Sequence, residues 1–428
     1  MGKRVLVISY TALMNASANG RTMKSLLAGV RREDISLFCC SGIPDADACA
    51  AAYKVSNKQA VYSILSSKKG GSVIPMDVQR EKVDPQMDTP KSKKKPWKYY
   101  AKEVAWRLGR WKKRAFRWIE AQKPDYVLYM YGDTPSLQNF ATEVSRRFDL
   151  PLLVYSCEDY CFKDYNYINR KDSSFFFKRY HKASLKATDR LFARAAGLIT
   201  NSELLGKAYT EKYGVAQPET LMMASDMEFI ENCGVREIPE TRVVYAGALG
   251  QFRAQALSEI AEALQRIDSR LRLSVYGRTS DPKVLEAFSA CPGLDYCGFV
   301  PYGEVLSIMR SSALLIETVN LDAYIAKDKK FGFSTKYADC FACGTPLLVY
   351  APEEIVETVF AKEHDCAFVC TDKEALVEVL GQALFDEDAR KALVKNAKDV
   401  TDRYFNKTLN MEKYDATVER ILSGREKA

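Results

Sequence analysis

One short segment in the second half of the chain carries the residues best suited to binding an anion. The pattern predicts a helix over residues 335–343, so Ser334 and Thr335 would stand at its N-terminus and Lys336 in its first turn. Backbone N–H groups and the positive end of the helix dipole favour negative charge at such an N-terminus. Because a lysine is unfavourable there, we expect Lys336 to face an anion that binds from outside the chain.

Further candidates lie in loops that directly follow predicted strands. Glu158 and Asp159 follow the strand Leu152–Cys157, and Gly20 lies in a turn-prone loop after the strand Arg4–Ser9. Parallel sheets bind ligands at the carboxyl ends of their strands, so either carboxylate is placed to orient a hydroxyl group. Glycine lets the backbone approach a ligand closely. Acidic residues and glycines are equally common in plain turns, so both interpretations stay open.

Short apolar strands alternate with helices along the chain in two separate series. In the first series the predicted strands are Arg4–Ser9, Ile35–Cys40, Tyr126–Tyr131, Leu152–Ser156 and Gly197–Thr200. In the second series they are Arg242–Ala246, Leu271–Tyr276, Leu294–Tyr296, Ala313–Ile316, Pro346–Val349 and Ala367–Val369. Strands separated by helices form parallel sheets, and 428 residues exceed one ordinary core. We therefore predict an α/β fold of two tandem, doubly wound, Rossmann-like domains that face each other across a cleft.

The border between the two series is an irregular stretch with polar breaks and two prolines. We place the N-terminal domain at residues 1–218, the linker at 219–240 and the C-terminal domain at 241–399. The remaining residues, 400–428, have the pattern of a helix with a polar tail.

Composition limits the class of protein. Hydrophobic residues make up 47% and charged residues 28%, and no apolar run approaches the length that spans a bilayer. The apolar run Val5–Ile8 is also too short for a signal peptide, so we expect a cytoplasmic protein. Several of the twelve cysteines lie in apolar runs, and the chain has two histidines. Because neither Cys39-Cys40 nor Cys157 with Cys161 has the paired CxxC spacing of a zinc site, we expect reduced cysteines and no metal.

A basic segment rich in tryptophan lies within the first series. Residues 91–118 contain twelve Lys or Arg and one acidic residue, Glu103. The pattern predicts one helix over residues 99–121, whose apolar stripe packs on the sheet. Trp97 and Trp106 lie off this stripe beside basic residues, a combination that suits an anionic membrane surface. No known nucleic-acid-binding module surrounds the segment, which argues against nucleic acid as a partner.

Three segments carry a resemblance to a known family. The strand Arg242–Ala246 ends in the glycine loop Gly247–Gly250, which is followed by Arg253. The segment Phe333–Pro346 combines a loop, a helix and a Gly-x-Pro turn, and the first series contains Arg194–Ser202. Together these segments resemble the GT-B glycosyltransferases of the glycogen-synthase-like retaining group (glycosyltransferase family 4-like). The resemblance covers most of the chain.

The resemblance implies a nucleotide diphosphate-sugar as donor, a saccharide or lipid-linked acceptor, and no cofactor. In such enzymes the C-terminal domain binds the donor and the N-terminal domain binds the acceptor. The donor site would therefore include Gly247, Gly250, Ser334 and Thr335, with Gly20 approaching from the N-terminal domain.

Roles for the charged residues follow from the same resemblance. Arg253 and Lys336 would neutralise the diphosphate, which gains charge as it leaves. Asp339 occupies the position of a glutamate that holds the ribose hydroxyls in the family. Glu158 and Asp159 would lie on the acceptor side. The implied reaction is hexose transfer with retention of configuration, in the assembly of a cell-surface polysaccharide or glycolipid.

The chain departs from the family pattern at one position. Phe331 stands where better-known members carry the first of two glutamates, eight positions before Asp339. This departure leaves open a non-catalytic relative that binds a nucleotide-sugar or scaffolds a partner transferase. A nucleotide-sugar epimerase of the same architecture is another alternative, although such enzymes use several carboxylates and histidines. By the same resemblance, residues 400–428 should cross back and complete the N-terminal domain.

Overall fold

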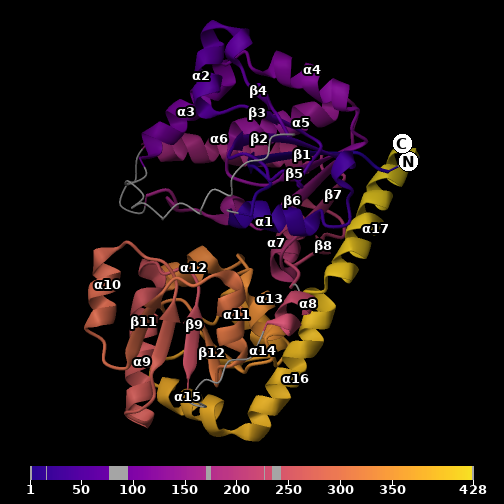
Figure 1. Ribbon diagram of the computed structural model, residues 1–428. Coiled ribbons are helices and arrows are strands. Elements are labelled where there is room, and N and C mark those ends of the chain that lie inside the picture. Colours follow the sequence, from indigo (N-terminus) through magenta and orange to yellow (C-terminus); the bar gives the residue numbers. More distant parts are fainter. Residues whose placement is uncertain are drawn as a thin grey trace. The chain divides into compact units, whose positions relative to one another are not determined.

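The chain folds into two compact units, shown in Figure 1. The computed structural model describes residues 2–15, 17–76, 95–169, 175–225, 227–233 and 242–426, so the lysines at 91–94 lie outside the described residues. The first unit contains the described residues up to Leu221 together with the segment that begins at Thr408. The second unit contains Met222–Lys407.

The first unit is built on an eight-stranded sheet in the order β4-β3-β2-β1-β5-β6-β7-β8. Its neighbouring strands are parallel, except that β4 pairs with β3 in the antiparallel sense at the edge. The strands are β1 (Val5–Thr11), β2 (Ile35–Ser41), β3 (Ala51–Lys54), β4 (Ser72–Ile74), β5 (Tyr126–Met130), β6 (Leu152–Ser156), β7 (Gly197–Thr200) and β8 (Glu219–Thr220).

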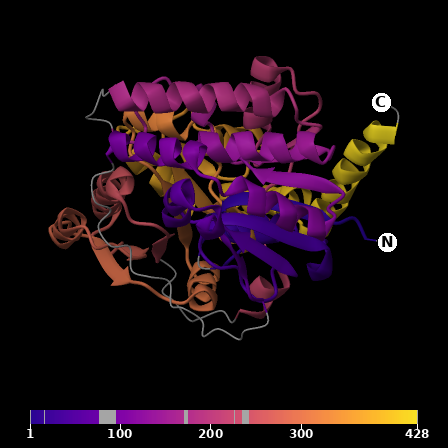
Figure 2. The same cartoon turned by 90° about the horizontal axis from the view of Figure 1, so that it is seen from above.

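Helices of the first unit pack on this sheet. They are α1 (Ala18–Leu26), α2 (Asn57–Leu65), α3 (Pro96–Leu108), α4 (Lys112–Gln122), α5 (Pro135–Arg147), α6 (Phe175–Phe192), α7 (Glu203–Tyr213) and α17 (Lys407–Glu426). Helix α6 runs alongside both α3 and α5, as Figure 2 shows.

The second unit is built on a six-stranded, fully parallel sheet in the order β11-β10-β9-β12-β13-β14. The strands are β9 (Val243–Ala246), β10 (Leu273–Tyr276), β11 (Leu294–Gly298), β12 (Leu314–Thr318), β13 (Leu347–Tyr350) and β14 (Phe368–Cys370). Counted from β9, this order is 3-2-1-4-5-6, which is the strand order of a Rossmann fold. Both sheets therefore have the α/β architecture expected from the sequence.

The helices of the second unit connect and cover these strands. They are α8 (Met227–Asn232), α9 (Gln251–Ile267), α10 (Pro282–Ser289), α11 (Tyr302–Arg310), α12 (Ala323–Lys329), α13 (Lys336–Ala342), α14 (Val356–Glu363), α15 (Leu376–Phe385) and α16 (Glu387–Tyr404). The strands β9, β12 and β13 are almost wholly buried, as parallel strands covered on both faces must be.

The C-terminal helix α17 contributes to the core of the first unit. Tyr414, Val418 and Ile421 are buried in the same apolar cluster as residues of β1 and β5. The hydroxyl group of Tyr414 lies 3.0 Å from that of Tyr126 on β5. Because the chain leaves the first unit after Leu221 and returns at Thr408, this core is assembled from two separated stretches of sequence.

The single helix predicted over residues 99–121 was wrong in one respect. The structure has two helices, α3 and α4, which are separated by residues 109–111. Gly109 packs so closely on α2 that a Cβ there would lie 2.8 Å from the carbonyl oxygen of Ala60. The prediction that Trp106 lies off the packed face was also wrong. Its side chain is 1% exposed, and its Nε1 donates a 2.9 Å hydrogen bond to Oδ1 of Asn57. Trp97 is 50% exposed.

Two further observations concern composition. All twelve cysteines are free, and nine of them are buried. Within the described ranges, no helix is both long enough and apolar enough to cross a membrane.

The two tryptophans give a matched test of this packing. We expect Trp106→Ala to destabilise the first unit by about 3 kcal/mol or more, because it removes a buried ring and leaves a cavity. Trp97→Ala should cost much less, because half of that side chain is already exposed. Thermal unfolding followed by circular dichroism measures the difference, and equal melting temperatures for the two variants would contradict the assignment of Trp106 to the core.

Candidate functional site

The candidate site lies at the point where the strand order of the second sheet reverses. Strands β9 and β12 are neighbours there although they are not consecutive in the chain. Gly247 directly follows β9, and Glu317 lies near the carboxyl end of β12. Doubly wound sheets bind their ligands outside the carboxyl ends of the strands at such a reversal. The strand order alone therefore predicts a ligand-binding site at this point, independently of the side chains.

The ammonium group of Lys336, the first residue of α13, reaches this point. Its Nζ lies 2.7 Å from Oε1 of Glu317 and donates a 3.3 Å hydrogen bond to the hydroxyl oxygen of Tyr245. The side chain of Glu317 is 4% exposed and that of Lys336 is 24% exposed. Burial acts to lower the pKa of Lys336, but Glu317 and Tyr245 outweigh it and raise the pKa. Lys336 is therefore a fixed cation at neutral pH.

Glycines at the ends of two strands make room for this ammonium group. A Cβ at Gly247 would stand 2.5 Å from Nζ of Lys336, and a Cβ at Gly277 would stand 2.1 Å from the carbonyl oxygen of Gly247. The loops after β9 and β10 therefore approach each other closely, and Lys336 packs against the first of them. Glycine is required at 277 by the close approach of the backbone, whereas a larger residue at 247 would displace the Lys336 side chain.

A second cation, Arg253, stands in the first turn of α9. Its Nε is buried and has no hydrogen-bond partner among the described residues. Burial lowers the pKa of Arg253, but the neighbouring Tyr245, Glu317 and Glu357 raise it by more. Buried N–H groups are normally paired, so this one points to an acceptor that the described chain does not supply.

A second buried carboxylate, Glu357, stands in the first turn of α14. Its Oε1 accepts a 3.0 Å hydrogen bond from the backbone N–H of Ser334, and its Oε2 is buried without a partner among the described residues. Burial raises the pKa of Glu357 to about 7. This carboxyl group therefore changes charge near neutral pH, in the neighbourhood of Arg253 and Glu317.

The start of α13 also makes contacts within the chain. The backbone N–H of Ser334 is engaged by Glu357, and Thr335 precedes the helix without a capping side-chain bond. Lys336 has a partner within the chain, Glu317, which the sequence did not indicate. The contact of Lys336 with an anion from outside the chain stays a prediction. A helix of seven residues also places Lys336 at its first position, where the side chain can turn towards the sheet.

Two residues of the site were missed by sequence reasoning. Glu317 is a charged residue at the end of an apolar strand, the same signal that singled out Glu158. Glu357 follows two further acidic residues, Glu353 and Glu354, and nothing in the sequence distinguishes the buried one from its exposed neighbours. Only the packing of α14 against the loop at Ser334 reveals it.

Asp339 and Gly250 belong to the same unit but not to the contacts around Lys336. Oδ1 of Asp339 accepts a 2.9 Å hydrogen bond from the hydroxyl of Tyr302, whose ring stacks on Phe229 at 5.8 Å. A Cβ at Gly250 would meet no atom within 4 Å, so the N-terminus of α9 is open there. Their roles toward a donor stay predictions.

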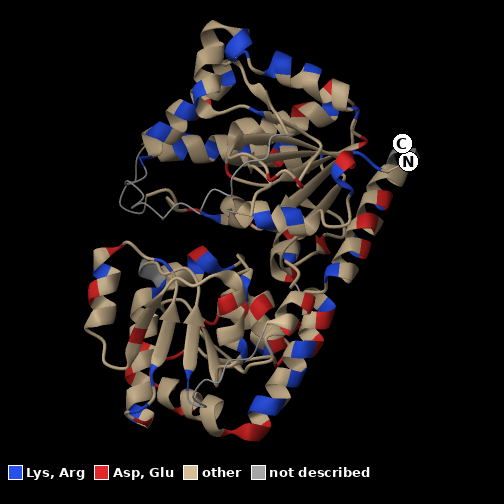
Figure 3. Ribbon diagram, in the orientation of Figure 1, with Lys and Arg blue, Asp and Glu red and all other residues tan. Residues whose placement is uncertain are grey.

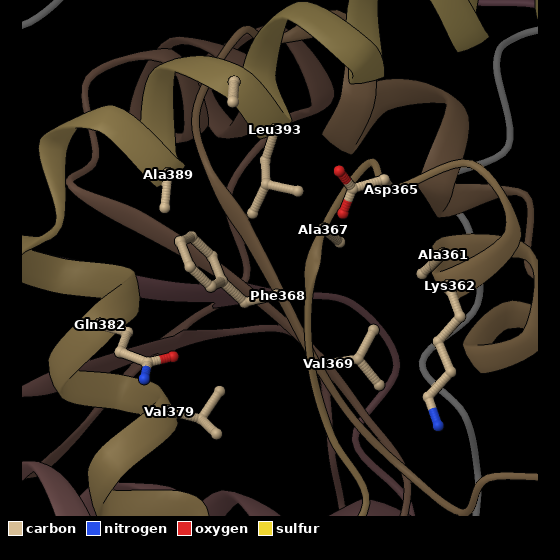
Figure 4. Close-up of a pocket in the computed structure, with 11 residues that line it drawn as sticks. Ala361, Lys362, Asp365, Ala367, Phe368, Val369, Val379, Gln382, Ala389 and Leu393 are labelled. Carbon is tan, nitrogen blue, oxygen red and sulfur yellow. The ribbon is translucent and has the colours of Figure 1, made fainter.

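A cavity of about 450 Å³ lies elsewhere in the second unit, between α14, β14, α15 and α16 (Figure 4). Its lining is mainly apolar, with polar groups from Lys362, Asp365 and Gln382. Arg253, Lys336 and Glu317 are not among its lining residues. The cavity is therefore separate from the candidate site.

In the first unit, Asp159 and Glu158 follow β6 as expected but differ in their surroundings. Asp159 is buried in an ion pair, with Oδ1 3.1 Å from Nζ of Lys163 and both side chains less than 10% exposed. The main-chain carbonyl of Glu158 accepts a 2.7 Å hydrogen bond from the hydroxyl of Tyr209. Asp159 is held by this ion pair, and the roles of Glu158 and Asp159 toward an acceptor stay predictions.

Gly20 lies in the first turn of α1, where packing explains it. A Cβ would stand 2.4 Å from the carbonyl oxygen of Met14, and the backbone N–H of Gly20 donates to Oγ of Ser17 at 3.4 Å. The residue is buried. A contact between Gly20 and a donor phosphate stays a prediction.

Asp133 is an acceptor-side candidate that sequence reasoning missed. It follows β5, which lies beside β1 at the reversal of strand order in the first sheet. Burial raises the pKa of Tyr167 and of Tyr180, and the charge of Asp133 raises both further. Tyr99 packs edge-on against Tyr180 with ring centres 5.8 Å apart. The criterion that selected Glu158, an acid directly after a strand, also applies to Asp133.

The position of Glu357 predicts a pH-dependent stability. A carboxyl whose pKa rises from 4.5 to about 7 on folding favours the folded state when protonated, so its contribution is lost as pH rises through this window. We expect Glu357→Gln to gain stability relative to the wild type between pH 5 and pH 8, by on the order of 3 kcal/mol. Melting temperatures across this range measure the effect. Glu363→Gln, at the exposed end of the same helix, is the control, and parallel pH profiles for wild type and Glu357→Gln would contradict the prediction.

Comparisons with known proteins give a family match over part of the chain and a fold match over nearly all of it. A family model described as Glycosyl transferase-like matches residues 253–417. No curated protein sequence matches the chain.

Solved structures share the fold over nearly the whole chain. The HepE protein of Anabaena, in complex with UDP and glucose, has a TM-score of 0.63 at 10% identity, covering 97% of this chain and 99% of that one. Sucrose-phosphate synthase from Thermosynechococcus elongatus has a TM-score of 0.63 at 12% identity, covering 99% and 100%. A glycosyltransferase from Rickettsia africae has a TM-score of 0.59 at 12% identity, covering 99% of each chain. The chain therefore has the GT-B fold, as the sequence implied, and residues 253–417 resemble the glycosyl transferase-like family.

Proposed function

We propose that the chain is a metal-independent glycosyltransferase that moves a hexose from a nucleotide diphosphate-sugar to a saccharide or lipid-linked acceptor. The observation that carries the proposal is the convergence of Lys336 and Arg253 on Glu317, at the strand-order reversal of a Rossmann-like sheet. Both cations lie in the segment matched by the family model. The HepE structure with UDP and glucose supports a uridine diphosphate-sugar as the first donor to test.

The charges at this point suit a diphosphate leaving group. Lys336 and Arg253 contribute two positive charges and Glu317 one negative charge, which leaves a net charge of about +1 while Glu357 is protonated. A leaving diphosphate gains negative charge as the glycosidic bond breaks, and cations already held in place stabilise that charge without reorganising. Glu317 then acts as a positioning residue, because it fixes the ammonium group beside the loop at Gly247.

The remaining assignments complete the proposed reaction. Asp339 accepts hydrogen bonds from the ribose hydroxyls, and Glu158 or Asp133 orients the acceptor. We propose retention of configuration, in which the departing phosphate takes the proton of the acceptor hydroxyl and no residue of the chain acts as nucleophile. A cytoplasmic location and a part in cell-surface polysaccharide or glycolipid assembly belong to the same proposal.

A second candidate is a protein of the same fold that does not catalyse sugar transfer. Phe331 replaces the first family glutamate, and Asp159 is committed to its ion pair with Lys163. Both observations favour a non-catalytic relative that binds a nucleotide-sugar or scaffolds a partner. Donor hydrolysis or sugar transfer by the purified chain alone would exclude this candidate.

Binding of nucleotides tests the donor site directly. We expect one of UDP, GDP, ADP or CMP, or its sugar, to raise the melting temperature of the wild type, because a ligand that binds the folded state stabilises it. Lys336→Ala and Arg253→Ala should each weaken that binding about tenfold or more, since each removes a charge-assisted hydrogen bond. Asp339→Ala should weaken it through the ribose. Lys391→Ala, on the exposed face of α16, is the matched control. A folded protein that responds to none of these ligands would contradict the proposal.

Two glycines provide a sharper test of the geometry. Gly247→Ala should displace the ammonium of Lys336 and weaken nucleotide binding about tenfold, whereas Gly381→Ala in α15 has free space away from the candidate site and should bind nearly as the wild type does. Because Nζ is the end of a flexible side chain, both variants should fold. Isothermal titration with the nucleotide identified in the screen measures both affinities. Equal affinities for the two variants would show that Lys336 does not act from its position beside Gly247.

A further inference from the structure

The helix α2 exposes an apolar strip where an ordinary surface helix is polar. Val61, Tyr62 and Leu65 are 48%, 54% and 88% exposed, whereas Ala60 and Ser63 are buried on the opposite face. Positions 58, 61, 62 and 65 share one side of a helix because residues three and four apart are neighbours. The side that packs on the fold is thus the small and polar one, and the large apolar side chains point outward.

The end of α3 extends this strip. Leu108 is 57% exposed, and the adjacent Gly109 packs so closely on α2 that a Cβ there would lie 2.6 Å from Oγ of Ser63. The backbone N–H of Arg110 donates a 3.2 Å hydrogen bond to the carbonyl of Ser63. The end of α3 that carries the exposed Leu108 therefore packs on α2.

Basic residues surround the apolar strip. Exposed cations come from α2, from the short helix Ser67–Lys69 that follows it, and from the junction of α3 and α4. They are Lys58, Lys68, Lys69, Arg107 and Arg110. Residues 57–76 contain no Asp or Glu, and among the charged residues of α2, α3 and α4 Lys and Arg outnumber Asp and Glu (Figure 3). We call the apolar strip, with Leu108 and these cations, the α2 surface.

We propose that the α2 surface is a docking site for an anionic lipid membrane. Helices that lie in a membrane interface combine outward apolar side chains with Lys and Arg that attract anionic headgroups. A second copy of the chain is a poor occupant, because a symmetric pairing of this surface would bring its cations together. Nucleic acid would engage the cations and leave the apolar strip without a function.

A neighbouring cavity fits the same ligand. Between α4 and α5 lies a cavity of about 530 Å³, lined by Lys112, Lys113, Arg117 and Arg147, with Phe116 and two glutamates. Lys112 is paired with Glu143 at 2.5 Å. The cavity therefore offers a surplus of cations beside the docking surface, where a phosphorylated headgroup could bind.

The proposal differs from the expectation based on sequence, which rested on Trp97 and Trp106. Trp106 is buried and cannot reach a membrane. The structure moves the surface to α2, a helix that the sequence analysis did not single out. The inference does not rest on the proposed transferase activity, since vesicle binding is measured without donor or acceptor.

Co-sedimentation of the full chain with lipid vesicles tests the proposal. The wild type should bind phosphatidylcholine vesicles that contain phosphatidylglycerol, bind pure phosphatidylcholine vesicles much more weakly, and be released by salt. The double variant Val61→Asp/Leu65→Asp should lower the partition coefficient at least about tenfold, because two apolar side chains no longer enter the interface. Lys68→Glu/Lys69→Glu should also lower it on anionic vesicles. All four positions are exposed, so the variants should melt at the wild-type temperature.

Two controls separate this surface from others. Phe385→Asp places the same charge on a side chain that is 62% exposed in the second unit, and it should bind as the wild type does. Trp97→Asp tests the alternative location, and it should retain most of the binding. Failure of the wild type to bind anionic vesicles would overturn the proposal. The proposal would also be overturned if Trp97→Asp lost vesicle binding while Val61→Asp/Leu65→Asp kept it. A protein that bound duplex DNA but no vesicles would overturn it as well. The nucleotide screen would be unaffected by any of these results.

Discussion

The ion pair between Glu317 and Lys336 joins β12 to α13 at the carboxyl ends of the strands of the second sheet. A carboxylate that is 4% exposed at the end of a buried strand needs a counter-charge, because an unpaired buried charge is strongly destabilising. Lys336 supplies that charge from the start of α13, and Gly247 in the loop after β9 leaves room for its ammonium group. Strand, helix and loop are thus held in one arrangement by a single contact. The same contact leaves an ammonium group at the place where a Rossmann-like sheet binds its ligand.

Two buried polar side chains, those of Arg253 and Glu357, lie near this ion pair. Among the described residues, neither the buried Nε of Arg253 nor the buried Oε2 of Glu357 has a hydrogen-bond partner. In a region that served stability alone, such atoms would be paired or replaced by apolar groups. Their persistence beside an ion pair is typical of a site arranged for a ligand rather than for the lowest free energy of the empty protein.

Much of the fold could be predicted from the sequence, and the reasons lie in particular elements. Apolar strands such as β9 and β12, each followed by a helix, indicate a parallel sheet. This pattern is local in the sequence, so it can be recognised without knowledge of the contacts between strands. Lys336 could be selected because a cation is unfavourable at a helix start. Glu357 could not, because its burial depends on the contact between α14 and the loop at Ser334, which are distant in sequence. The burial of Trp106 was missed for the same reason, since it depends on packing against α2.

The division of the first unit into two stretches of chain has a consequence for synthesis on the ribosome. Domains generally fold as units while the chain emerges, with the N-terminal one first. Here the first sheet emerges early, yet Tyr414, Val418 and Ile421 of its apolar core are made only after the whole of the second unit. The described part of the second unit is one continuous stretch, Met222–Lys407. Part of the apolar core of the first unit therefore stays uncovered until α17 has been synthesised. The domain whose synthesis begins first is the one that is completed last.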